Sequence, residues 1–194
     1  MKSETQTQTA PARIHRILAY RWFHICAAAV LVLDQLTKFW IHNNERLPFE
    51  SYGPGRHIEL IPGFFNIVHV GNTGAAWNIL SGRSTLLAVF ALAVLLFIFF
   101  SRNALGLRQR ATQVAFGLLC GGIVGNLIDR IVHKHVIDFL DFHFGGYAYP
   151  AFNIADIGIC CGVGIYIFLT LLSAVGKKNR GDAARHSGNQ KPEN

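Results

Sequence analysis

Four long apolar runs constrain the fold of this chain more than any other feature of its sequence. They cover residues 22–42, 84–101, 111–128 and 153–175, and a helix needs about 20 such residues to cross the hydrocarbon of a bilayer. Hydrophobic residues make up 51% of the 194 residues and charged residues only 15%, a balance typical of membrane proteins. The sequence therefore predicts a membrane α-helical fold with four transmembrane helices.

Basic residues flank these runs and predict how the chain crosses the membrane. Twelve of the eighteen Lys and Arg lie in residues 2–21, in residues 102–110 or after residue 175. Lys and Arg accumulate in cytoplasmic loops, so we expect both termini inside and the loops 43–83 and 129–153 outside. A nucleic-acid-binding protein would gather its positive charge on one soluble face. We therefore expect membrane lipids, and no nucleic acid, as partners.

The same pattern predicts three segments. Residues 1–21 are expected to form a disordered cytoplasmic tail, residues 22–175 one four-span domain, and residues 176–194 a second disordered cytoplasmic tail. The first apolar run follows arginines, as a secretory signal does, but it is long enough to span the membrane and is expected to be retained.

The first outer loop carries a signal for β-structure. Residues 57–61 and 64–70 are short β-like runs joined by Pro62-Gly63, which favours a hairpin. We expect a small extracytoplasmic β-hairpin or sheet region, with short loop helices.

Two aspartates at the edges of the last two apolar runs are the strongest candidates for chemistry. Asp138 lies in the second outer loop and Asp156 lies just inside the fourth run. Carboxylates are costly near hydrocarbon and are usually functional there. Two carboxylates that share one proton can supply both the base and the acid that peptide hydrolysis needs. The hypothesis is a two-aspartate hydrolytic site at the membrane surface, without a metal.

The residues around this pair leave alternatives open. Asn153 and Asp156 have the spacing of a helix-capping pair. Asp141, three residues after Asp138, would share a helical face with it, but the residues around them favour an extended segment. In that case Asp141 faces solvent or caps the fourth helix.

Other polar and small residues within the runs favour structural roles. Asp34 and Lys38 are four residues apart and can pair on one helical face. Both a structural ion pair and a direct role in substrate binding are open. We favour a supporting role in which the pair orients the site. Asp129 is expected to form an ion pair at the interface. Glycines follow each other at helix-packing spacing in the third run: Gly117, Gly121, Gly122 and Gly125.

Six histidines outside the spans raise the possibility of a metal site: His42, His57, His69, His133, His135 and His143. His133 and His135 share one side of an extended segment, but no helical HExxH motif is present. We expect solvated loop histidines, no metal and no cofactor.

Two other classes of function fit part of the pattern. Asp34 within a span would suit a small proton-coupled membrane transporter, although no inverted repeat is visible. A non-catalytic chaperone, which would bind its client without cleaving it, would not need both aspartates.

Five motif blocks, in order, resemble those of bacterial lipoprotein signal peptidase, also called signal peptidase II. They are DQLTK at residues 34–38, NTGAAW at 72–77, GIVGNLIDR at 122–130, VIDF at 136–139 and FNIAD at 152–156. The resemblance covers about residues 20–175. The family more usually has Phe and a small residue where this chain has Trp77-Asn78, a difference that concerns the shape of the pocket.

The resemblance implies an intramembrane aspartic endopeptidase of the bacterial inner membrane, with its active site near the periplasmic face. Such enzymes cleave prolipoproteins on the N-terminal side of a diacylglyceryl-modified cysteine. Asp138 and Asp156 match the catalytic aspartates. The positions that match substrate-binding or supporting residues are Asn72, Asn126, Arg130, Asn153, Asp34, Lys38, Gly122, Asp129 and Ala155. The expected partner is a lipid-modified prolipoprotein, and the enzyme is expected to be a monomer.

Overall fold

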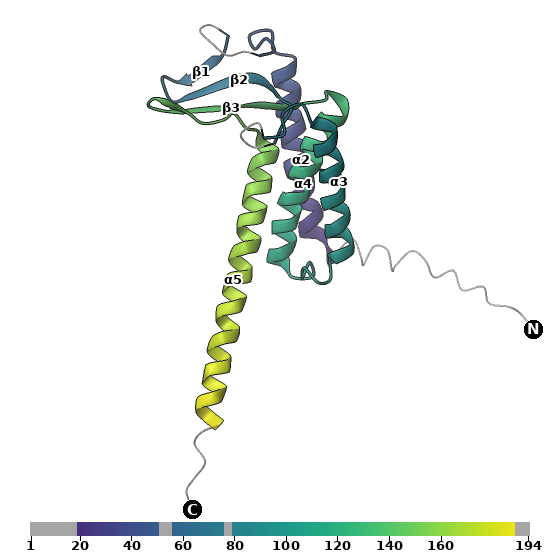
Figure 1. Ribbon diagram of the computed structural model, residues 1–194, viewed down its shortest axis with the longest axis vertical. Coiled ribbons are helices and arrows are strands. Elements are labelled where there is room, and N and C mark those ends of the chain that lie inside the picture. Colours follow the sequence, from purple (N-terminus) through teal and green to yellow (C-terminus); the bar gives the residue numbers. More distant parts are fainter. Residues whose placement is uncertain (1–18, 51–55, 76–78, 189–194) are drawn as a thin grey trace, which may run out of the picture.

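The computed structural model describes residues 19–50, 56–75 and 79–188. Over these residues the chain forms four helices and one four-stranded sheet. The helices are α2 (Arg21–His42), α3 (Ser84–Ser101), α4 (Arg110–Val132) and α5 (Ile154–Gly188). The strands are β1 (Ile58–Ile61), β2 (Phe65–Asn72), β3 (Val136–Phe144) and β4 (Tyr147–Ala148). The helices run alongside one another, and the sheet lies across one end of them (Figure 1).

The four helices confirm the predicted membrane spans. Each is long and apolar enough to cross a bilayer, with α5 contributing its segment Ile154–Gly176. Only 22% of the apolar window of α2 is buried, and only 11% of the windows of α3 and α5, whereas α4 has 56% of its window buried. An exposed apolar surface of this kind is what hydrocarbon covers, so the helices define a multi-pass membrane protein.

Two helix ends differ from the predicted ones. Helix α4 ends at Val132 rather than near residue 128, which places Asp129 and Arg130 inside the helix. Helix α5 continues to Gly188, so residues 176–188 are helical where a disordered tail was expected. This stretch holds six Lys, Arg and Ala residues, which are good helix formers, against three glycines, and it continues a helix already nucleated by the span. Residues 1–18 and 189–194 lie outside the described residues, and the domain boundaries stay predictions.

Helix α4 lies at the centre of the bundle and contacts α2, α3 and α5. A Cβ atom on Gly117 would lie 2.6 Å from the carbonyl oxygen of Phe23, and one on Gly121 the same distance from that of Ala27. A Cβ atom on Gly122 would collide with the carbonyl oxygen of Ala155. The predicted role of these glycines in helix packing is confirmed, because only the absence of a side chain allows α2 and α5 to approach this closely.

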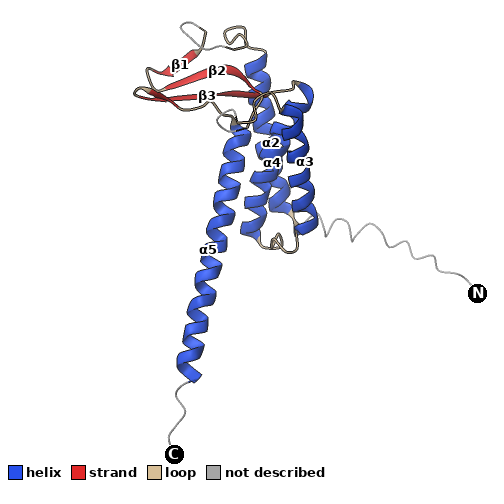
Figure 2. Ribbon diagram, in the orientation of Figure 1, coloured by secondary structure: helices blue, strands red, loops and turns tan. Residues whose placement is uncertain are grey.

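The sheet is antiparallel, with the order β1-β2-β3-β4; Figure 2 labels its first three strands. The predicted hairpin is present as β1 and β2, whose turn includes Gly63 at a φ of 68°, a conformation that suits glycine. Short loop helices are not found in the described loops 43–50, 79–83 and 102–109. Isolated turns occur there instead, such as the one closed by the Leu47 N–H on the Asn44 carbonyl.

Strand β3 fixes the start of α5 beside itself. The backbone N–H groups of Phe139 and Leu140 both donate to the Phe152 carbonyl, at 3.1 and 2.9 Å, and the Phe152 N–H donates to Leu140. The last residues before α5 are therefore held against the part of β3 that carries Asp138. This contact brings the two candidate aspartates to the same end of the bundle.

Candidate active site

Asp138 lies on β3 with only 2% of its surface exposed. Its Oδ1 accepts a hydrogen bond from Asn153 Nδ2 at 2.7 Å, and its Oδ2 accepts one from Asn72 Nδ2 at 3.0 Å. A second hydrogen bond orients each donor amide: the Asn72 side-chain oxygen accepts from the Gly74 N–H, and the Asn153 side-chain oxygen accepts from the Asp156 N–H. Neither amide can turn its oxygen toward Asp138 without losing a partner. The carboxyl group is thus held by two oriented donors.

Asp156 occupies the first turn of α5, where it forms a reciprocal cap with Asn153. The Asp156 N–H donates to Asn153 Oδ1 at 3.0 Å, and the Asn153 N–H donates to Asp156 Oδ2 at 3.2 Å. Two of the unpaired N–H groups at a helix start are satisfied in this way. The capping arrangement left open by the sequence is therefore present, and it uses only one oxygen of Asp156.

The other oxygen of Asp156 faces α4. Asn126 Nδ2 donates to Asp156 Oδ1 at 2.8 Å. The Asn126 side-chain oxygen accepts from Lys38 Nζ at 2.9 Å and from Asn153 Nδ2 at 3.2 Å. Each oxygen of Asp156 therefore faces a donor: Oδ1 faces the Asn126 amide, which its other contacts orient, and Oδ2 faces the backbone N–H of Asn153.

Asn153 connects the two aspartates directly. Its side-chain amide bonds to Asp138 and its backbone N–H bonds to Asp156, while none of its surface is exposed. Burial raises the pKa of Asp138 to about 7, and the neighbouring charge of Asp156 adds to the increase. The hydrogen bonds from Asn72 and Asn153 act in the opposite direction. Near neutral pH, a proton on Asp138 is therefore readily gained and lost, as general acid–base chemistry requires.

A buried ionic cluster supports the pair from within the bundle. Lys38 Nζ lies 2.9 Å from a carboxylate oxygen of Asp34 and 2.9 Å from one of Asp129. Asp34 Oδ1 accepts from the Ala155 N–H at 2.9 Å, in the first turn of α5. Asp129 Oδ2 accepts from the Ile137 N–H at 3.1 Å, next to Asp138. The cluster thus ties α2 and α4 to the two segments that carry the aspartates.

Gln35 belongs to this cluster and was missed in the sequence. Its Nε2 lies 3.2 Å from oxygens of both Asp34 and Asp129. The signal that could have found it is the amide itself, because a polar side chain within a spanning run needs a partner. Sequence alone does not show that Gln35 bonds to the same two carboxylates as Lys38.

Arg130 holds the loop that follows β2. Its guanidinium donates to the carbonyl of Gly74 at 3.0 Å and to that of Asn126 at 3.3 Å. These bonds place the loop that directly follows Asn72 against α4, so Arg130 positions the site through the backbone. Residues Trp77 and Asn78, where the chain departs from the family pattern, lie outside the described residues.

Asp141 is not solvent-exposed and does not cap α5, so both expectations for it were wrong. It is 4% exposed and lies on β3, where it accepts from Asn66 Nδ2 at 3.1 Å and from His143 Nε2 at 2.7 Å. Successive side chains of a strand alternate between its faces, so Asp141, three residues along from Asp138, projects to the opposite face. It belongs to a separate polar contact within the sheet.

One of the six histidines differs from expectation. His69 is 3% exposed, and its ring belongs to a group of four: His42, His69, His133 and His135, with centroid separations of 5.2–5.9 Å between neighbours. Solvation is therefore the wrong description for His69. Burial lowers the pKa of His69 and of His135. Among the described residues no group of three His, Cys, Asp or Glu side chains is arranged to hold a metal ion.

The fold and the site together define a class: a polytopic helical membrane protein with a pair of aspartates at one end of its bundle, of which Asp138 is buried and Asp156 is half-buried. Comparison with known proteins identifies the family. Residues 26–172 match the model of signal peptidase (SPase) II, and the chain belongs to the signal peptidase II family. It is therefore a membrane protease of bacterial type, in a family that acts on lipoprotein precursors.

Individual relatives agree with this assignment. The chain is 40% identical over 159 residues to a lipoprotein signal peptidase of Bacillus pumilus, with 82% of this chain and 97% of the relative covered. It is 44% identical over 146 residues to one of Oleidesulfovibrio alaskensis, covering 72% and 87%. A solved bacterial membrane enzyme is similar in fold, with a TM-score of 0.68, 32% identity and coverage of 88% of this chain and 93% of the other. The predicted family resemblance is confirmed.

Proposed function

We propose that this protein is an intramembrane aspartic endopeptidase that cleaves prolipoproteins on the N-terminal side of a diacylglyceryl-modified cysteine. The observation that carries the proposal is the arrangement of Asp138 and Asp156, whose four carboxylate oxygens each face an oriented donor. Asn153 links the two groups. The names of the relatives supply the substrate class.

In the proposed mechanism Asp138 begins as the acid and Asp156 as the base. The oxygen of a water molecule attacks the scissile carbonyl carbon while Asp156 takes a proton from that water. At the same time Asp138 gives its proton to the carbonyl oxygen. The tetrahedral intermediate then collapses: the proton held by Asp156 passes to the amide nitrogen, the C–N bond breaks, and the hydroxyl proton returns to Asp138. The pKa of about 7 for Asp138 supports its starting role as the proton donor.

The asparagines contribute by holding both carboxyl groups through these steps. Asn72 and Asn126 each donate to one aspartate, while Asn153 donates to both. Groups that are already oriented need no reorganisation when charge moves between the two carboxyls. Lys38, Asp34, Asp129 and Arg130 act through the positions of these residues rather than on the substrate.

The test is cleavage of a purified substrate by the purified protein. A lipid-modified prolipoprotein is incubated with the enzyme in detergent, and the product is identified by mass spectrometry. We expect a shortened protein whose first residue is the lipid-modified cysteine, and much less product from the same precursor without lipid. An uncut precursor, or a product that begins elsewhere, would contradict the proposed function.

A further inference from the structure

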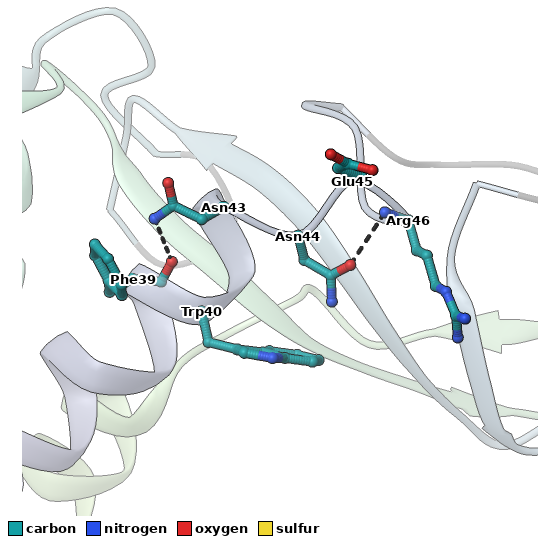
Figure 3. A pocket seen from close by; sticks show the side chains of 6 residues that line it. All are labelled: Phe39, Trp40, Asn43, Asn44, Glu45 and Arg46. Atoms are coloured by element: carbon teal, nitrogen blue, oxygen red, sulfur yellow. Dashed lines mark hydrogen bonds between the residues drawn. The ribbon is translucent and has the colours of Figure 1, made fainter.

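A hollow lies at the end of α2, on the side of the molecule that carries the sheet (Figure 3). Its volume is about 460 Å³. It shares no residue with the aspartate site, and its lining residues are Phe39, Trp40, Asn43, Asn44, Glu45 and Arg46. The proposed peptidase activity assigns it no role.

The position of this hollow matches the headgroup level of a bilayer. Helix α2 has 22 residues and is therefore about 33 Å long at 1.5 Å per residue, close to the roughly 30 Å of the hydrocarbon core. Residues 43–46 follow directly and so lie at the polar boundary. Phe39 is 69% exposed and Trp40 is 53% exposed in the last helical turns, where aromatic side chains meet lipid.

Local hydrogen bonds fix the shape of the loop that forms the hollow. Asn43 Nδ2 donates back to the Phe39 carbonyl at 2.8 Å, which closes the helix end. The Arg46 N–H donates to Asn44 Oδ1 at 3.0 Å, a turn that engages the oxygen of Asn44 and leaves its NH2 end on the side of the hollow (Figure 3). The hollow is therefore built by a defined turn.

The side chains in the hollow carry hydrogen-bond donors and a positive charge. Trp40, Asn44 and Arg46 project to the same side, and the Glu45 carboxylate points away from them (Figure 3). An indole N–H, an amide NH2 and a guanidinium together offer donors to an anion, and a guanidinium suits phosphate in particular. Because the hollow lies at the level of the lipid headgroups, these donors can reach the phosphate group of a phospholipid.

We propose that this hollow binds the phosphate of an anionic phospholipid in the leaflet on the side of the sheet. The Arg46 guanidinium and the Asn44 amide contact the phosphate, and the lipid chains lie along Trp40 and Phe39. The bound lipid anchors the end of α2.

Quenching of Trp40 fluorescence tests the proposal. The full chain contains three tryptophans, so Trp22→Phe and Trp77→Phe leave Trp40 as the only one. This protein, in micelles of a neutral detergent, is titrated with phosphatidylglycerol that carries brominated acyl chains. We expect saturable quenching by phosphatidylglycerol and weaker, non-saturating quenching by brominated diacylglycerol, which lacks a phosphate.

Charge variants separate this local site from general attraction. Arg46→Gln is expected to weaken the saturable quenching about fivefold, the usual contribution of one basic residue near a membrane surface. The matched control is Arg56→Gln, on the same side of the protein but outside the hollow, which should leave the titration unchanged. Unchanged melting temperatures of both variants show that they fold. Quenching that never saturates, that is equal with diacylglycerol, or that both variants weaken equally would overturn the proposal.

Discussion

Asn153 is the residue on which the geometry of the two aspartates depends most. It donates to Asp138 through its side chain and to Asp156 through its backbone, and it caps α5 at the same time. Asparagine is common at helix N-caps, so capping is the one role of Asn153 for which the sequence gives a physical reason. The second contact, across to β3, arises because β3 and the start of α5 are hydrogen-bonded to each other.

The pKa of Asp138 leads to a prediction about the pH dependence of cleavage. If Asp138 starts as the acid, kcat/KM should fall about tenfold per pH unit above pH 7, since its protonated fraction falls in that proportion and its pKa is about 7. The measurement is a pH series of initial rates at low substrate concentration. Asp141→Asn is the control and should show the same profile. A rate that instead rises as pH increases through 7 would assign Asp138 the role of base.

Lys38 is predicted to be the most costly residue to remove from the ionic cluster. It is 2% exposed and contacts Asp34, Asp129 and Asn126. Lys38→Met would leave two buried carboxylates without their cation, which typically costs about 3–5 kcal/mol. We expect a large fall in melting temperature, measured by scanning fluorimetry, and loss of cleavage. Lys134→Met, which replaces an exposed lysine, should change little; equal effects of the two variants would show that the cluster is not important for stability.

Among the elements, the contact between α4 and the first turn of α5 sets the position of Asp156. Gly122 lies against the carbonyl of Ala155, and Gly125 against the Asp34 carboxylate. A methyl group at Gly122 has no space unless the start of α5 moves. The glycine spacing in the sequence predicted close packing but could not indicate which helix each glycine contacts.

Gly122→Ala adds only one methyl group, but it should reduce activity strongly because that group displaces the start of α5. Overpacking typically costs about 1–3 kcal/mol, and a shift of about 1 Å in a catalytic group can cost a hundredfold in rate. We expect cleavage to fall at least about tenfold, measured as single-turnover rates. The control is Gly164→Ala, also in a helix, where an added Cβ meets nothing within 4 Å. Full activity of the Gly122 variant would mean that α5 is not positioned by this contact.

The elements also show where sequence reasoning succeeded and where it stopped. The spans and the hairpin were predictable because hydrophobic length and turn residues are local signals. The end of α4 was placed too early because Asp129 and Arg130 interrupt the apolar run. They continue the helix because Asp129 pairs with Lys38 on α2 and accepts from the Ile137 N–H on β3, and Arg130 donates to the Gly74 carbonyl. The burial of Asp141 and His69 depends on strand register, which no local pattern specifies.

At the scale of the whole molecule, the topology is the prediction that sets where the site acts. The loop 102–110 carries three arginines and no acidic residue, which favours the cytoplasmic side. The site lies at the opposite end of the bundle, beside the sheet (Figure 1). The active site is therefore predicted to face the periplasm.

A cysteine at Asn103, an exposed position of that loop, tests this orientation. The native thiols Cys26, Cys120, Cys160 and Cys161 are unpaired in the structure and are first replaced by alanine. In intact cells an impermeant maleimide should fail to label the new cysteine, and it should label it after the cells are opened. Labelling from outside would reverse the topology and place the site on the cytoplasmic side.

The central claim is that Asp138 and Asp156 together hydrolyse the peptide bond, and single-turnover cleavage by three variants tests it most directly. Asp138→Asn and Asp156→Asn should each slow cleavage of a lipid-modified prolipoprotein by about a hundredfold to ten-thousandfold, because an amide cannot relay the proton. Both should still bind the substrate in a pull-down, which excludes misfolding. Asp141→Asn, matched in chemistry and buried on the same strand, should retain measurable turnover. An inactive Asp141 variant beside an active Asp138 variant would contradict the claim.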